Sequence, residues 1–196
     1  MINLSQGKKL INLARESISC YLSNKDVNVK DFISEFSDIL GVFVTLNKEG
    51  KLRGCIGFPE AVYPLYEGVI KAAQSAAFSD PRFSAVEKDE LSLISIEISV
   101  LTKPMLIKVK KASEYVDEIK VGSDGLIIRS SQGSGLLLPQ VATEYNWDSK
   151  TFLEQTCVKA GLSPDSWQDV EEISVYKFQS QVFSEIKPNG EVKQLM

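Results

Sequence analysis

Histidine is absent from the 196-residue sequence, and cysteine occurs only three times. Without histidine the chain cannot build a Ser-His-Asp triad, a Cys-His pair or a histidine-ligated metal site. The cysteines, at positions 20, 55 and 157, are odd in number and widely spaced, which fits neither a disulfide framework nor a zinc knuckle. We therefore expect free thiols and no metal site, and any catalysis would fall to Cys, Asp, Glu, Lys, Tyr or Arg.

Long apolar runs and an excess of basic charge are also missing. No run approaches the roughly 18 residues of a membrane span, and the start, MINLSQGKKL, lacks the apolar core of a signal peptide. The 22 basic and 26 acidic residues are dispersed, with a net charge of −4. This balance gives no basic footprint for nucleic acid. We expect a cytoplasmic protein without membrane contact, for which RNA and DNA rank low as partners.

Hydrophobic periodicity predicts the first elements. Apolar residues recur at the helical period over residues 5–22, with Ser5 as N-cap, and a long helix is expected over residues 63–80, with Pro64 in its first turn. Between them, GVFVTLNKEGKLRGCIGF predicts a β-hairpin around the turn NKEGK. The segment LSLISIEISVL alternates apolar and polar residues as a half-buried strand does.

The second half carries clearer stop signals. ASEYVDEI is a short helix candidate, and strands separated by Gly/Ser turns follow it. WDSKTFLEQTCVKAGLSP predicts a helix capped by Asp148 and stopped at Gly161. ISVYKFQSQVFSEI reads as a long closing strand, followed by a polar tail that we expect to fray.

These elements show no regular βαβ repeat and predict an α+β fold, with a mainly antiparallel sheet flanked by helices. The length suits a single domain over residues 1–196. The turn-rich residues 104–142 predict a smaller, β-rich lobe.

The segment LRGCIGF, residues 52–58, is the strongest functional candidate, because glycines weaken a strand that serves only for packing. Strand alternation puts Arg53, Cys55 and Gly57 on one face, and Leu52, Gly54, Ile56 and Phe58 on the other. A guanidinium beside the thiol would favour the reactive thiolate. Alternatively, Cys55 is a small buried hydrophobe and Arg53 is held by a carboxylate as a structural pair between lobes.

Other polar residues have two interpretations each. Asp80 ends the long helix, where the dipole disfavours a carboxylate, so Arg82 or Arg53 should compensate it, as an anion clamp or as a loop-fixing salt bridge. Glu97 is either solvated or, beside Cys55, the best available general base. Gln140 either presents an amide to a ligand or closes a turn. Trp147 is expected to pack.

The remaining cysteines are expected to be buried. Cys157 lies among apolar neighbours on its predicted helix, and we expect Cys20 to be a core residue as well.

Over residues 5–186 the chain resembles the AMMECR-one domain family, named for the AMME syndrome chromosomal region. The resemblance rests on LRGCIG, AAFSDPRF, IEISVL followed by a proline, DGLII, and GLLLPQVATEYNWDSKTFLEQTCVKAGL, in the family's order. It implies a two-lobed α+β protein with a cleft between the lobes, and LRGCIG as the functional segment. The family's biochemical activity is not established, so the resemblance supplies no reaction or cofactor. Here DGLII is followed by RSSQGSG, which differs from the turn in many relatives.

The resemblance also implies a functional link to Memo-like and radical-SAM proteins, beside which some members occur. Our first hypothesis is a cleft-centred small-molecule enzyme or binding protein. In it, Cys55 is nucleophile or redox thiol, Arg53 orients an anionic group, and Glu97 or Asp80 handles protons. Backbone near Gly54 and Gly57 would approach the ligand, with Arg82 and Gln140 as further ligand contacts.

The alternative is a non-enzymatic interaction module that docks a protein or, less readily, RNA. It predicts that Cys55→Ser is tolerated and that charge reversal at Arg53 is not.

Overall fold

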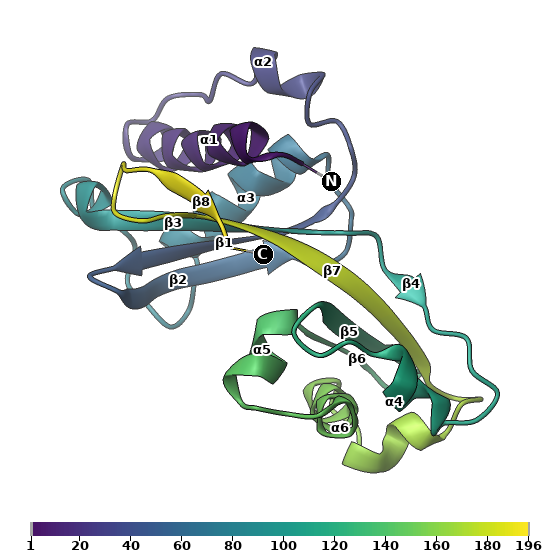
Figure 1. Cartoon of the computed structure of the whole chain (residues 1–196). Coiled ribbons are helices and arrows are strands. Elements are labelled where there is room, and N and C mark those ends of the chain that lie inside the picture. The colour runs from purple at the N-terminus through teal and green to yellow at the C-terminus, as the bar shows by residue number, and fades with distance from the viewer. Residues whose placement is uncertain (1, 196) are drawn as a thin grey trace. The chain divides into compact units, whose positions relative to one another are not determined.

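Helices and antiparallel strands are mixed along the chain, which confirms the α+β prediction (Figure 1). The computed structural model describes residues 2–195. The helices are α1 (Leu4–Leu22), α2 (Lys30–Ile33), α3 (Leu65–Phe78), α4 (Glu114–Glu118), α5 (Pro139–Glu144) and α6 (Ser149–Lys159), with 3-10 turns at Glu90–Leu93 and Pro164–Gln168. The strands are β1 (Gly41–Lys48), β2 (Lys51–Phe58), β3 (Ile94–Leu101), β4 (Met105–Leu106), β5 (Asp124–Arg129), β6 (Ser134–Leu137), β7 (Ser174–Glu185) and β8 (Val192–Gln194).

The chain divides into two compact units. The first comprises the residues up to Leu101 together with the segment from Gln181 onward, and the second spans Thr102–Ser180. The second unit extends beyond the turn-rich residues 104–142, because α6 shares a hydrophobic core with β5. Within residues 2–195, no helix combines the length and apolar character needed to cross a bilayer.

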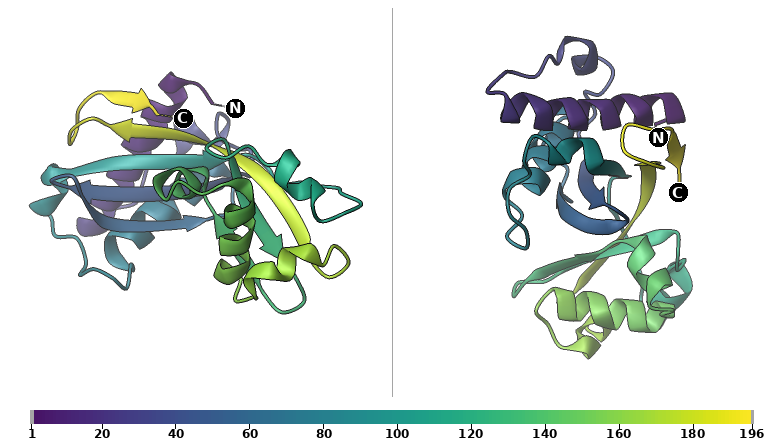
Figure 2. Two further views of the ribbon diagram at one scale, coloured as in Figure 1. Left: turned by 60° about the horizontal axis from the view of Figure 1, so that its bottom comes forward. Right: turned by 90° about the vertical axis from the view of Figure 1, so that its left-hand side faces the viewer.

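The first unit is a helix-backed antiparallel sheet. Its strands run in the order β2-β1-β3-β7, and β8 pairs with the end of β7. Helices α1 and α3 lie on the same side of this sheet (Figures 1 and 2). Alternate strand residues pack under them, and the core includes Leu10, Ile11, Val42, Val44, Leu46, Val69, Ala72, Ala76, Ile94, Ile96 and Ile98. The intervening residues Phe43, Thr45, Cys55, Gly57, Glu97 and Ser99 make up the other side, which we call the Cys55 face.

Two expectations about the ends of the chain are wrong. The N-cap of α1 is Asn3, whose side chain accepts from the backbone N–H of Gln6, while Ser5 already lies inside the helix. The polar tail forms β8 over Val192–Gln194, because Val192 is buried and its strand pairs with β7. The start of α3 also differs from the expectation, because Pro64 is its N-cap and does not lie inside its first turn.

The second unit contains β4, β5 and β6, the first part of β7, and helices α4 to α6. β5 pairs with β6 on one side and with β7 on the other, both antiparallel. Asp148 caps α6 by accepting from the Thr151 N–H, and Gly161 follows with φ +79°, as the sequence predicts. Cys157 is fully buried in this core and Trp147 packs against it, which confirms both as packing residues.

Gly54 owes its identity to the packing of β2 against α3. A Cβ atom at this position would lie 2.2 Å from the carbonyl oxygen of Ala76. Backbone meets backbone here, so neither side can move away as a flexible side chain would. Glycine at position 54 therefore lets α3 lie directly on the edge strand.

We predict that Gly54→Ala lowers the free energy of unfolding by about 2 to 3 kcal/mol, through overpacking. Gly50→Ala is the matched control: it is the same chemical change at a φ of +74° with open space around it, and should cost about 1 kcal/mol. Urea denaturation of both variants measures the difference. Equal losses would contradict the role of the α3 contact.

Candidate functional site

A β-bulge in the β1–β2 ladder decides where Arg53 points. Gly54 lies opposite Leu46, but Leu52 lies opposite Asn47, so Arg53 is an extra residue on β2. Arg53 therefore shares the helix side of the sheet with Lys48, and Cys55 faces the other way. The expectation that Arg53 and Cys55 share one face is wrong. Leu52, beside the bulge, is 44% exposed and does not belong to the core.

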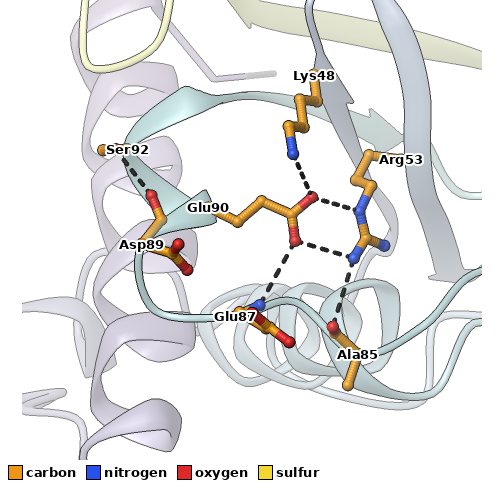
Figure 3. A network of polar contacts seen from close by, with 7 residues as sticks. All are labelled: Lys48, Arg53, Ala85, Glu87, Asp89, Glu90 and Ser92. Carbon is orange, nitrogen blue, oxygen red and sulfur yellow. Dashed lines mark hydrogen bonds and ion pairs between the residues drawn. The ribbon is translucent and has the colours of Figure 1, made fainter.

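Arg53 and Lys48 converge on the carboxylate of Glu90 (Figure 3). Arg53 donates from Nε to Oε1 at 2.8 Å and from Nη2 to Oε2 at 3.0 Å, and Lys48 Nζ donates to Oε1 at 3.0 Å. The Arg53 and Glu90 side chains are only 13% and 14% exposed. A carboxylate thus holds Arg53 in a bidentate pair, as the alternative interpretation of the sequence predicts. That interpretation expected a pair between lobes, but Arg53 and Glu90 both belong to the first unit.

The ion pair shifts the protonation of Glu90. Hydrogen bonds from Arg53 lower the pKa of Glu90 to about 2, against the effect of burial, and Lys48 adds to the shift. Together with residues of the preceding loop, these side chains line a recess of about 270 Å³. Cys55 is not among the described residues that line it.

We predict that Arg53→Ala destabilises the protein by about 2 to 3 kcal/mol at pH 7, because it leaves Glu90 charged and mostly enclosed. The pKa of folded Glu90 lies below its ordinary value of 4.5, so this stabilisation is complete above that value and disappears as the pH falls toward about 2. Lys48→Ala should cost at most about 1 kcal/mol, because Lys48 is more exposed. Denaturation at pH 7 and at pH 3 tests this, and a pH-independent loss would contradict it.

The outer edge of β2 at Cys55 is satisfied by the loop that follows α3. Asp80 Oδ2 accepts from the Cys55 N–H at 2.9 Å, and Arg82 Nη2 donates to the Cys55 carbonyl at 3.1 Å. Arg82 also donates to both carboxylate oxygens of Asp80, at 2.9 and 2.7 Å. Because β2 is an edge strand, these two side chains supply the donor and acceptor that a further strand would have supplied.

Asp80 and Arg82 therefore form a loop-fixing salt bridge. The Asp80 side chain is 1% exposed and the Arg82 side chain 52%. Hydrogen bonds from Arg82 hold the pKa of Asp80 well below its usual range, and Asp80 in turn raises the pKa of Arg82. Arg82, not Arg53, is the cation that compensates the helix end and the one that contacts Cys55.

We predict that Asp80→Ala accelerates amide hydrogen exchange at Cys55 and destabilises the protein by about 2 to 3 kcal/mol, because the part-buried N–H of Cys55 loses its acceptor. NMR-detected exchange of the Cys55 amide measures the first effect. Asp89→Ala, at an exposed aspartate of the same loop, should change stability by less than about 0.5 kcal/mol. Unchanged protection at Cys55 in Asp80→Ala would contradict the edge-pairing role.

A row of polar side chains crosses the Cys55 face. Thr45 on β1 lies opposite Cys55 on β2 and opposite Glu97 on β3. The Thr45 hydroxyl donates to the Cys55 sulfur at 3.3 Å, and Ser184 on β7 hydrogen-bonds to Glu97. We call Cys55, Thr45, Glu97 and Ser184 the polar row. The thiol is half-buried, so it is not sealed inside packed apolar atoms.

Glu97 is half-buried and is not a solvated surface carboxylate. Burial raises the pKa of Glu97, and the hydrogen bond from Ser184 offsets this only in part. A carboxyl group of raised pKa exchanges protons closer to neutral pH than an ordinary glutamate does. The alternation of LSLISIEISVL predicts the strand that carries Glu97, and Glu97 is the acidic member of the polar row.

The remaining predicted site residues have other surroundings. A Cβ at Gly57 would lie 2.3 Å from the ring of Phe43, so this glycine makes room for a neighbouring aromatic side chain. Gln140 lies in the first turn of α5, in the second unit, and does not close a strand turn. Cys20 is half-buried, contrary to its predicted place in the core.

Sequence reasoning missed Glu90, Lys48 and Thr45. A ladder counted from the NKEGK turn without the bulge places Thr45 opposite Gly54, so its position opposite Cys55 could not be found from the sequence. Nor could Glu90, because its pairing depends on the path of a loop. No group of three or more Cys, Asp or Glu side chains within residues 2–195 is arranged to hold a metal ion.

The fold and the site define an α+β protein with a helix-backed antiparallel sheet whose edge strand carries a thiol between glycines. The sequence matches the AMMECR1 family model over residues 11–183, and the chain belongs to the AMMECR1 family.

Its relatives match over nearly their whole length. Protein MJ0810 from Methanocaldococcus jannaschii is 44% identical over 98% of this chain and 96% of its own. A protein from Thermococcus onnurineus is 49% identical over 95% of this chain and 94% of its own. The crystal structure of the uncharacterized protein PH0010 from Pyrococcus horikoshii superposes with a TM-score of 0.89, at 46% identity and 98% coverage of both chains.

Proposed function

We propose that the Cys55 face binds a small molecule and that Cys55 acts there as nucleophile or redox thiol, with Glu97 as the proton acceptor. The observation that carries this proposal is the register of three strands, which aligns Cys55, Thr45 and Glu97 across the sheet. In a protein without histidine, a thiol and a carboxyl group of raised pKa are the available nucleophile and base.

The backbone around Cys55 supports a fixed orientation of the thiol. Both of its outward backbone groups are held, the N–H by Asp80 and the carbonyl by Arg82. A nucleophile on a strand so fixed loses little freedom when a substrate binds, which favours reaction.

The spacing of the polar row suits a ligand between thiol and acid. Cys55 and Glu97 are two strands apart, so their Cα atoms are separated by about 10 Å. A small molecule lying over Thr45 would contact both side chains. In this arrangement Cys55 gives its proton to Glu97 through the Thr45 hydroxyl, and the sulfur adds to a carbonyl carbon of the ligand as the π electron pair of the carbonyl moves onto its oxygen.

The proposal assigns no chemistry to three residues considered earlier. Arg53 faces the other side of the sheet and is neutralised by Glu90. Gly54 and Gly57 are accounted for by contacts with α3 and with Phe43. Asp80 and Arg82 act as positioning residues for Cys55.

We predict that iodoacetamide alkylates Cys55 about tenfold or more faster than Cys20, a degree of activation within reach of a positioned base. Mass spectrometry of the digested protein measures all three thiols in one sample. Cys157 provides the unreactive reference, because burial raises the pKa of Cys157 to about 11. The rate of Cys55 alkylation should rise with pH as Glu97 loses its proton. Because the pKa of Glu97 is raised, this rise should occur at a higher pH than the ionisation of an ordinary glutamate.

Glu97→Gln should slow Cys55 alkylation and remove this part of the pH profile, whereas Glu87→Gln, at an exposed glutamate, should leave both unchanged. A thermal-shift screen of metabolites, with Cys55→Ser alongside the unchanged protein, tests for the ligand. A Cys55 that reacts no faster than a model thiol, combined with no stabilising metabolite, would refute the proposal.

A further inference from the structure

The outer surface of α3 carries a second recess, which involves none of the polar row. It encloses about 350 Å³ and is formed by α1, β2, α3 and the segment before α3. Its lining residues, which we call the α3 groove, are Tyr21, Phe58, Tyr63, Lys71, Gln74, Ser75, Phe78 and Ser79. A volume of this order is at the lower end of that of small-molecule sites.

The floor of the α3 groove follows from helical spacing. Lys71, Gln74, Ser75 and Phe78 stand at positions i, i+3, i+4 and i+7, so they share one stripe of α3. The opposite stripe, which includes Val69, Ala72, Ala73 and Ala76, is buried against the sheet and α1. Of the four groove residues on α3, Phe78 also packs against this core, whereas Lys71, Gln74 and Ser75 are half-buried and polar.

Aromatic pairs form the walls. Tyr21 stacks on Phe78, with ring centroids 4.2 Å apart and planes inclined by 20°. Phe58 meets Tyr63 edge to face, at 5.2 Å. Tyr21 remains 55% exposed, so part of its ring is accessible to a ligand. Flat aromatic surfaces that stay accessible favour stacking with another planar ring.

The charge in the α3 groove is positive. Lys71 Nζ lies 5.0 Å from the centre of the Tyr63 ring. Its carboxylate neighbour, Glu67, is 3.6 Å away, and both side chains are at least 40% exposed, so this pair binds Lys71 weakly. The described residues that line the groove include no aspartate or glutamate. The hydroxyl groups of Ser75 and Ser79 add hydrogen-bonding capacity.

From these features we infer that the α3 groove binds a planar aromatic ring that carries a negative charge, in the manner of a single mononucleotide. The ring would stack against Tyr21 and the Phe58–Tyr63 pair, and the anionic group would contact Lys71. The recess has room for one such ligand, and a chain of net charge −4 gives no continuous track for a polynucleotide. The inference is independent of the function proposed for the Cys55 face.

Isothermal titration of the full chain with AMP tests this inference. Adenosine, which has the same ring without the charge, should bind about threefold or more weakly, as expected for loss of an exposed ionic contact. Tyr21→Ala should weaken AMP binding about fivefold or more, through loss of stacking. Lys71→Ala should reduce AMP binding to the level of adenosine binding.

The matched control is Lys8→Ala, at an exposed lysine of α1 in the same unit, and it should leave AMP binding unchanged. Melting temperatures of all variants verify folding, and the exposure of Tyr21 makes its replacement tolerable. Failure of AMP to saturate the protein, or equal affinity in Tyr21→Ala and Lys8→Ala, would overturn the inference. Tighter binding per nucleotide by a short oligothymidylate would overturn it as well, in favour of single-stranded nucleic acid.

Discussion

The β-bulge at Arg53 on the edge strand is the constraint from which the arrangement of the first unit follows. One extra residue between Leu52 and Gly54 turns the guanidinium to the helix side of the sheet, where Glu90 and Lys48 hold it. It leaves Cys55 on the opposite face. Gly54 makes this geometry compatible with α3, because any side chain there would collide with the Ala76 carbonyl. The motif LRGCIGF, which suggests one site in the sequence, thus places Arg53 and Cys55 on opposite sides of the sheet.

The edge of the sheet illustrates how a loop can replace a strand. Edge strands normally leave backbone donors and acceptors open to other chains. Here an aspartate and an arginine two residues apart satisfy both backbone groups of Cys55, and the aspartate is buried in doing so. Such pairing fixes the strand that carries the thiol without covering the face on which the thiol lies. The loop after α3 therefore belongs to the site through its hydrogen bonds to the Cys55 backbone.

The two surfaces to which we assign ligands differ in their physical basis. The Cys55 face depends on strand register, which places a thiol, a hydroxyl and an acid in line. The α3 groove depends on helical periodicity and on aromatic rings from four segments of the chain. Histidine plays no part in either, and in the function we propose the proton acceptor is Glu97, whose pKa is raised by burial. Both surfaces are built within the first unit, whose core is independent of that of the second.

Local sequence signals determined most of the secondary structure, including the hairpin, the strand of Glu97 and the capped helix that begins after Asp148, because periodicity and capping act over a few residues. The motifs of the family were also legible in the sequence alone. The bulge, the pairing of Arg53 with Glu90, the β8 strand and the role of Gly54 were decided by tertiary structure. Each of these features depends on contact between residues far apart in the chain or on a single extra residue in a ladder. Neither kind of dependence produces a periodic pattern in the sequence. For that reason the sequence singled out Arg53 and Cys55 together, while only the folded sheet determined that they face away from each other.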